Sequence, residues 1–342
     1  MKKIGFKAVA TTTTTALIAA AVAALLTACA TPEEAKPIVG RMSALPPMTY
    51  PADNPTSPAK VALGKQLFAD TRLSGGGKAA CQICHYRDLG WTDANALSAK
   101  EDGSINTRHT PTLYNVGHQS LWYWDGRATT LEAQTLAAWR GQTLADPAKI
   151  VALLNTVPGY VTQFQAVYGG PATPDNVVKS LTTFFRTLNS ENAPWDKYEM
   201  GDTKAVSTDA VEGYKVFAGK GQCIVCHSPP MYGNSTFFNI GLEHGKAKPD
   251  VGRFNVTKEP SDMSAFKTPT LRSIELSGPY FHDGSVAKLE DAVRYMAGGG
   301  KPDPNKSPIL RDTQLTDKEV GQVVAFLKTL TSTEKWEQPK LP

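Results

Sequence analysis

Apolar residues recur at helical spacing along the chain, most clearly in two stretches. The stretch that begins at Pro174 places apolar residues three and four positions apart, as one face of an α-helix requires. A second apolar series follows Thr316, and Glu319 completes a capping box with that threonine. No alternating run is long enough to predict a β-sheet. The pattern therefore predicts an all-α protein.

The helical pattern occurs twice in similar form. A Gly-x-x-x-Phe motif, a Thr-Pro-Thr-Leu motif and an Asp-Gly pair follow one another in each half, and the last two keep an equal spacing. The matching segments are 64–68 and 213–217, 110–113 and 268–271, and 125–126 and 283–284. Unrelated segments would not keep these equal spacings by chance. The sequence therefore predicts two similar domains, 59–200 and 201–342, that are related by internal duplication.

Length and composition agree with this organisation. The 342 residues suit two domains of roughly 150 residues each. A content of 41% hydrophobic and 20% charged residues excludes a disordered or collagen-like chain. The formal net charge is +4, and three of the lysines lie within the first seven residues, in a segment expected to be removed. The remaining charge is too small to indicate nucleic acid as a partner.

The first 28 residues have the pattern of a signal peptide. Lys2 and Lys3 form a basic start, and positions 16–26 are eleven consecutive apolar residues. A helix of this length rises about 16 Å, whereas the hydrocarbon core of a bilayer is about 30 Å thick. We therefore expect cleavage rather than a retained membrane span, and export of the chain to the periplasm.

The segment after this leader predicts a lipid anchor on a tether. The residues from Leu26 to Cys29 resemble the lipoprotein box, in which the cysteine becomes the lipidated N-terminus. Ordinary cleavage after an A-x-A-like site, Ala28-Cys29-Ala30, is the alternative interpretation. Residues 29–58 are rich in proline and predict an extended tether. The lipid on Cys29 would then be the one contact with the membrane.

Two C-x-x-C-H motifs use the other four cysteines. They comprise Cys81, Cys84 and His85 in the first half and Cys223, Cys226 and His227 in the second. This spacing lets two thiols add to the vinyl groups of one haem while the adjacent imidazole binds the iron. A zinc site would need further ligands at comparable spacing, and a thiol–disulfide site needs no histidine. The motifs therefore predict two covalently bound c-type haems in two tandem cytochrome c-like domains.

The two predicted haems differ in their sixth ligand. Met296 lies thirteen residues after Asp283, and the residue thirteen positions after Asp125 is Ala138. A methionine opposite the histidine gives a six-coordinate haem for electron transfer, whereas a missing ligand leaves the iron open to a small molecule. The alternative is that Met296 is an ordinary core residue.

The motifs around these haem sites resemble a known family. The segments that carry the resemblance are 108–113, 124–128, 266–272 and 279–284, together with both C-x-x-C-H motifs. In this combination the chain resembles the bacterial di-haem cytochrome c peroxidase/MauG superfamily, from about residue 56 to 335. The resemblance implies that the first haem reduces hydrogen peroxide and that the second collects electrons from a small cytochrome c or cupredoxin. It also implies that Trp124 lies between the haems, and it leaves room for a homodimer.

The resemblance also assigns individual residues. Gln134 matches the distal glutamine of the family, and Met296 matches the axial methionine of the peroxidases. MauG has a tyrosine as that ligand, so Tyr295 is a rival. Leu144 stands where the family has an acid–base glutamate, and leucine cannot move a proton. We therefore expect slow peroxide turnover unless another carboxylate takes this role. The candidates for such a substitute are Glu101, Asp102 and Asp146.

A calcium ion between the domains is a further implication of the resemblance. The asparagine that binds it in the family corresponds to His109, and the backbone carbonyls that bind it correspond to Ser277 and Pro279. Imidazole is a poor ligand for a hard cation that prefers oxygen. The sequence therefore supports a bound calcium ion and a site without calcium equally.

Three activities remain open at this level. The first is reduction of hydrogen peroxide. The second is a MauG-like oxidation of aromatic residues on a partner protein, for which aromatic side chains of the first half offer a route. These are Trp122, Tyr123, Trp124 and Trp139. The third is electron transfer without catalysis, with the first iron capped by His109 or His118.

Overall fold

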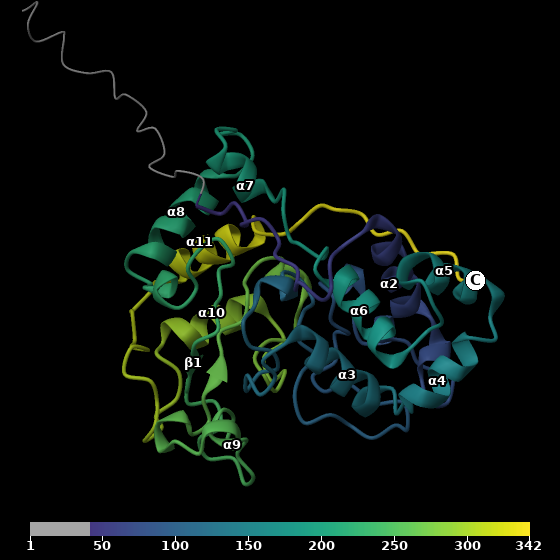
Figure 1. The fold of residues 1–342 in the computed structure, drawn as a ribbon. Coiled ribbons are helices and arrows are strands. Elements are labelled where there is room, and N and C mark those ends of the chain that lie inside the picture. Colours follow the sequence, from purple (N-terminus) through teal and green to yellow (C-terminus); the bar gives the residue numbers. More distant parts are fainter. Residues whose placement is uncertain (1–41) are drawn as a thin grey trace, which may run out of the picture. The chain divides into compact units, whose positions relative to one another are not determined.

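The computed structural model describes residues 42–342, which form a mainly helical fold (Figure 1). The predicted leader, Cys29 and the first part of the predicted tether lie outside the described residues. Within 42–342, no helix combines the length and the apolar character that a membrane span needs. Export and lipid attachment therefore stay predictions.

The secondary structure of residues 42–342 is mainly helical, as the sequence predicts. The α-helices are α2 (Pro58–Ala69), α3 (Leu131–Gln142), α4 (Pro147–Leu154), α5 (Pro158–Tyr168), α6 (Pro174–Phe185), α7 (Pro194–Glu199), α8 (Thr208–Ala218), α9 (Phe254–Thr257), α10 (Leu289–Ala297) and α11 (Asp317–Lys328). Short 3-10 helices are η1 (Thr71–Leu73), η2 (Cys81–Ile83), η3 (Arg87–Leu89), η4 (Val116–His118), η5 (Cys223–Val225), η6 (Pro260–Asp262) and η7 (Ile274–Leu276). The helices predicted from Pro174 and after Thr316 are confirmed, and Thr316 and Glu319 form the capping box that the sequence indicates.

One small sheet corrects the all-α prediction. Strand β1 (Phe237–Phe238) pairs antiparallel with β2 (Phe266–Lys267). Each strand has only two residues, so alternation between polar and apolar positions cannot reveal it. The fold of the described residues is mostly helical with this one short pair.

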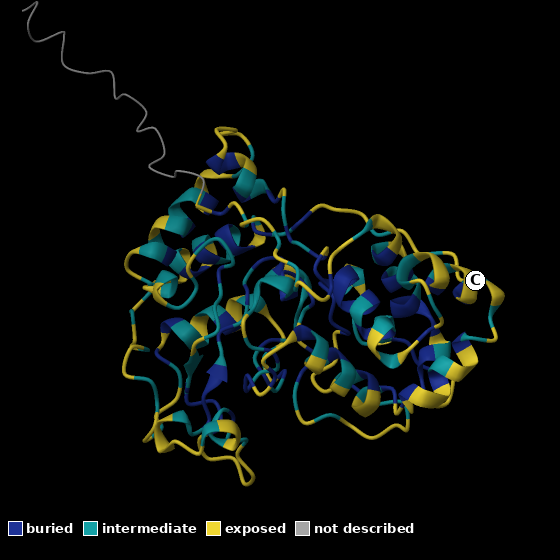
Figure 2. Cartoon of the chain, in the orientation of Figure 1, coloured by how far each residue is buried: buried dark blue, intermediate teal, exposed yellow. Residues whose placement is uncertain are grey.

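The core of the first half is built on a close helix crossing. Helix α2 packs against α6, and a Cβ on Gly64 would lie 2.0 Å from the carbonyl oxygen of Ser180. Only glycine lets the two backbones approach this closely. Phe68, one turn further along α2, is fully buried against Phe184 and Phe185. The Gly-x-x-x-Phe motif therefore forms a packing surface. Figure 2 draws the buried parts of the helices in dark blue.

The second half uses the same motif in the same way. Helix α8 packs against α11, and a Cβ on Gly213 would lie 1.8 Å from the carbonyl oxygen of Gln322. Phe217 is buried against Phe326, with ring centroids 5.1 Å apart. The parallel with α2 and α6 supports the predicted duplication, which stays a prediction.

Part of the predicted tether is packed against the protein. Residues 42–57 contain no helix or strand, but Ser43 and Asn54 are buried. The backbone N–H and hydroxyl of Ser43 both donate to Glu199, at 2.8 Å each, and the amide of Asn54 donates to Thr182. Proline content indicates extended backbone but not whether neighbouring polar groups will bind it.

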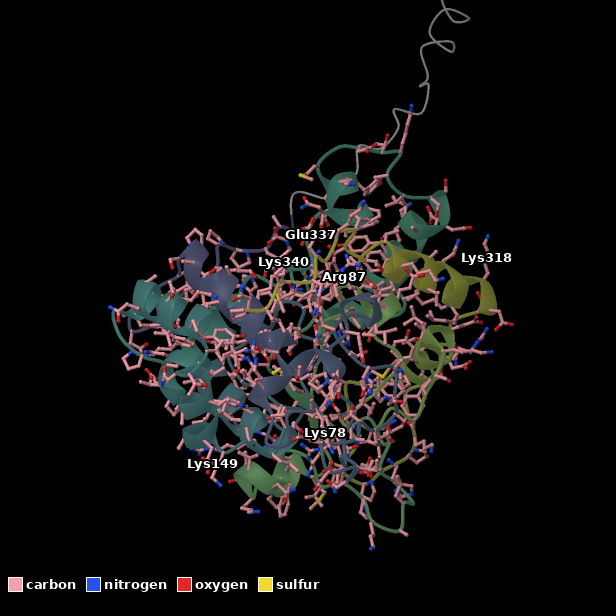
Figure 3. The ribbon with its side chains drawn as sticks, turned by 90° about the vertical axis from the view of Figure 1, so that its right-hand side faces the viewer. Lys78, Arg87, Lys149, Lys318, Glu337 and Lys340 are labelled. Carbon is pink, nitrogen blue, oxygen red and sulfur yellow. The ribbon has the colours of Figure 1, made fainter. Side chains whose placement is uncertain are left out.

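The C-terminal segment crosses onto the first half. Trp336 packs on Phe68 and Trp91, and the carbonyl oxygen of Lys340 accepts a hydrogen bond from Gln66. Figure 1 shows this segment running from α11 to a C-terminus beside α5, and Figure 3 labels Glu337 and Lys340 along it. The end of the second predicted domain therefore contributes to the core of the first.

The glycine crossing of α8 and α11 can be tested directly. Gly213→Ala forces the two backbones apart, and we expect it to lower the free energy of unfolding by about 1–3 kcal/mol, the usual cost of overpacking. Gly321→Ala is the matched control, because Gly321 is exposed on α11 with nothing near its Cβ position. It should stabilise by roughly 0.5–1 kcal/mol. Denaturant unfolding of the haem-loaded protein measures both, and equal effects would refute the crossing.

Candidate haem sites

Each C-x-x-C-H motif begins with a single 3-10 turn. In η2 the N–H of Cys84 bonds the carbonyl of Cys81, and in η5 the N–H of Cys226 bonds that of Cys223. All four cysteines are free thiols. The turn holds the two thiols of each motif close together, as attachment to one porphyrin requires.

The thiols are poorly suited to zinc. Burial raises the pKa of Cys81 to about 12 and that of Cys223 to about 11. Metal binding needs thiolates, which these values disfavour at neutral pH. Among residues 42–342, no group of three or more His, Cys, Asp or Glu side chains could hold a metal ion. The geometry therefore fits thioether attachment of haem.

The two histidines are oriented as iron ligands. The Nδ1 of His85 lies 2.8 Å from the carbonyl oxygen of Trp91, and the Nδ1 of His227 lies 2.9 Å from that of Tyr232. A carbonyl only accepts, so Nδ1 carries the proton and Nε2 carries the lone pair. Burial lowers the pKa of both imidazoles and keeps them neutral. A neutral imidazole with a free Nε2 is what haem iron binds.

One cavity of about 770 Å³ contains both motifs. Its wall includes Cys81, Cys84, His85, Cys223, Cys226 and His227. The two motifs therefore face a common interior space.

The cavity wall differs between the halves at the expected position. Helix α10 begins at Leu289 and places Met296 on the wall, whereas α3 begins at Leu131 and places Ala138 there. The rival ligand Tyr295 is not on the wall. Its hydroxyl donates to the carbonyl oxygen of Ile240 at 2.9 Å. The arrangement supports Met296 as the thioether ligand of the second haem.

Trp124 lies where segments of the two halves exchange backbone hydrogen bonds. The N–H of His109 donates to the carbonyl of His282 at 2.7 Å, and that of Lys267 donates to the carbonyl of Trp124 at 2.8 Å. The indole Nε1 of Trp124 donates to the carbonyl oxygen of His109 at 2.9 Å. Trp124 is therefore fixed at the junction of the halves, on the wall of the shared cavity.

The side chain of His282 meets Trp124 at this junction. Their ring centroids are 6.4 Å apart in an edge-on arrangement, and His282 also stacks on Phe266 at 3.4 Å. The Nε2 of His282 is 2.7 Å from a carboxylate oxygen of Glu243, and both residues are buried. The carboxylate of Glu243 is therefore engaged by His282 inside the protein. No sequence motif points to Glu243.

The predicted proton-transfer position lies outside the cavity. Leu144 is 43% exposed, has a φ of +50° and does not contribute to the wall. Gln134 is on the wall, and so is Glu101. The other two candidate carboxylates are elsewhere: Asp102 is exposed, and Asp146 caps the N-terminus of α4.

Glu101 is held as a carboxylate. Its oxygens accept hydrogen bonds from the hydroxyl of Ser74 and from the N–H groups of Gly76 and Lys78. Burial opposes the charge, but these hydrogen bonds outweigh it and place the pKa below its ordinary value. Glu101 is therefore an ionised carboxylate on the cavity wall at neutral pH.

The residues predicted to bind calcium fit that ion poorly. His109, Ser277 and Pro279 all line the cavity. The Nδ1 of His109 is 2.8 Å from the carbonyl oxygen of Asn95, and its buried Nε2 has no protein partner among the described residues. A nitrogen ligand with two carbonyl oxygens is not the oxygen-rich set that calcium prefers. His118, the other candidate cap for the first iron, is not on the wall.

Comparison with known proteins agrees with these sites. The family described as di-haem cytochrome c peroxidase matches residues 58–204. The cytochrome-c peroxidase IdrP1 of Denitromonas iodatirespirans is 36% identical over 87% of this chain and 89% of the relative. The methylamine utilization protein MauG of Methylorubrum extorquens is 35% identical over 89% of this chain and 87% of the relative.

A solved structure gives the same result. The crystal structure of a MauG-like protein associated with microbial copper homeostasis has a TM-score of 0.79 and 30% identity, covering 84% of this chain and 94% of the other. The chain belongs to the di-haem cytochrome c peroxidase/MauG superfamily. Members of this family are peroxidase-type oxidoreductases with two c-type haems, and the resemblance inferred from the motifs is confirmed.

The sixth ligand of the second haem can be tested by substitution. Met296→Leu keeps the apolar volume but removes the thioether, so we expect the near-infrared methionine–iron band to disappear and the reduction potential of that haem to fall. Tyr295→Phe is the matched control and should leave the band in place, because its hydroxyl bonds Ile240. Absorption spectroscopy of the ferric protein measures both. Persistence of the band in Met296→Leu would contradict Met296 as the ligand.

Proposed function

We propose that the chain is an exported di-haem c-type cytochrome that reduces hydrogen peroxide at the first haem. Electrons enter from a small cytochrome c or cupredoxin through the second haem. The carrying observation is the unequal cavity wall, because Met296 would supply a thioether to one iron and Ala138 would leave the other open. Lipid attachment through Cys29 remains part of this proposal.

The bound haems would supply the redox chemistry, and the chain would position the reactants. Reduction of hydrogen peroxide to two waters consumes two electrons and two protons. Gln134, on the same face of α3 as Ala138, can orient peroxide through its amide. Glu101 can take the proton that peroxide gives up and return it to the leaving oxygen.

Trp124 would carry electrons between the two haem pockets. The carbonyl of His109 that accepts its indole N–H cannot take up a proton. Trp124 therefore keeps its proton when it loses one electron towards the first pocket, and one electron from the second pocket restores it. The surrounding hydrogen bonds hold the ring in place during both steps.

Oxidation of aromatic residues on a partner protein is the second candidate. Its support is the similarity to MauG and the aromatic residues at the cavity. Tyr123 would be an exit towards the surface, but the guanidinium of Arg127 lies 3.5 Å above its ring. A nearby cation makes removal of an electron harder. Trp139, a further member of that route, is buried and its Nε1 donates to the carbonyl of Leu73. We therefore place peroxide reduction first.

Stopped-flow mixing with peroxide tests the proposal. Protein that has been pre-reduced by a chemical donor should consume peroxide catalytically and return to the ferric state. Long-lived oxidation of unreduced protein without turnover would favour the MauG-like activity. Absence of any reaction, with or without pre-reduction, would leave electron transfer alone and overturn the proposal.

The role of Glu101 gives a second test. Glu101→Gln removes the proton acceptor, and we expect the rate with peroxide to fall by about 10²–10⁴-fold. Asp102→Asn is the matched control, because the neighbouring Asp102 also bonds its own loop but is exposed and off the wall. It should keep the full rate. Leu144→Glu should not raise the rate, and a gain there would move proton transfer from Glu101 to position 144.

A further inference from the structure

Lys267 belongs to the second half but reaches into the first. It lies on β2, directly before the second Thr-Pro-Thr-Leu motif, at the position that His109 occupies before the first. Its backbone N–H donates to the carbonyl of Trp124 at 2.8 Å. Its ammonium donates to the side-chain oxygen of Gln119 at 2.5 Å. Both partners belong to the first half, and Lys267 and Gln119 line the cavity.

Two arginines that line the cavity with Lys267 are paired with carboxylates of the protein. Arg108 forms ion pairs with Asp125 at 2.7 Å and with Asp250 at 2.6 Å. Arg127 forms an ion pair with Asp125 at 2.8 Å. Lys267 has no ion pair with an acidic residue of 42–342. It therefore presents an ammonium to the cavity with only a neutral amide as its partner.

The ammonium of Lys267 on the cavity wall is expected to bind an anion. Loss of water around Lys267 lowers its pKa to about 8. Lys267 is half-buried on the cavity wall, and a charge drawn partly out of water is usually paired, because leaving it alone is costly. The two carboxylates already on the cavity wall, Glu101 and Asp125, are engaged by other donors. A ligand of the cavity can supply the anion that the protein itself does not provide.

We propose that Lys267 is a carboxylate-binding site and that its ammonium pairs with a propionate of the first haem. The first haem is assigned because both hydrogen bonds of Lys267 go to residues of the first half. Haem carries two carboxylates, which are anions of the required kind. The pairing ties the first haem to the second half of the chain, beside Trp124. It rests on the haem loading proposed above but not on peroxidase activity.

The pairing predicts a selective change in reduction potential. Reduction adds an electron to the iron, so a nearby positive charge favours the reduced state. Removing the ammonium leaves the propionate unbalanced and should lower the potential of the first haem. The second haem should keep its potential, because its pocket does not contain this contact.

Spectroelectrochemical titration of the fully loaded protein, without peroxide, tests the site. Lys267→Met should lower the potential of the first haem only, and Lys267→Arg, which keeps the charge, should restore it. Lys248→Met is the charge-matched control, since Lys248 is exposed and off the cavity wall. It should change neither potential. Lys267→Gln is the second neutral variant if Lys267→Met loads haem incompletely.

Three results would overturn the assignment. Potentials equal to those of Lys248→Met in both neutral variants would show that Lys267 pairs with no haem carboxylate. A shift confined to the second haem would assign the contact to the other pocket. Equal shifts in both haems would indicate a general electrostatic effect. None of these results depends on whether peroxide is turned over, so failure of this site and failure of the proposed function are distinguishable.

Discussion

The exchange of backbone hydrogen bonds around Trp124 is the constraint on which the two-haem arrangement depends. His109 bonds to His282, and Lys267 bonds to Trp124, so that a segment of each half is held by the other. The indole of Trp124 is fixed by a third bond within the same group. Because these bonds join backbone groups, they hold the two C-x-x-C-H motifs on one cavity regardless of most side-chain changes.

Around this junction the halves are built alike and then differ in a few side chains. Both use a glycine-mediated helix crossing, and both hold the histidine of the C-x-x-C-H motif through Nδ1. The differences lie at positions that match in the two repeats. Met296 in the second half corresponds to Ala138 in the first, and Lys267 corresponds to His109. A thioether on one wall and an open wall on the other are enough to give one haem for electron transfer and one for a small molecule.

The sequence predicts those features that depend on local pattern. Helix α6 and the capping box of α11 are confirmed, because each is specified by residues a few positions apart. It misses features that depend on contacts between distant segments. The sheet joins two short strands, the segment at Trp336 crosses to the first half, and Glu101 and Lys267 gain their importance only from the cavity they face.

The central claim is that the two irons differ in their sixth ligand, and electron paramagnetic resonance of the fully ferric protein tests it most directly. The account predicts two signals of equal amount, one high-spin from the first haem and one low-spin from the second, because Met296 would complete the coordination of the second iron and Ala138 offers no ligand to the first. An entirely low-spin spectrum would mean that another residue caps the first iron, and would contradict the open site on which peroxide reduction depends.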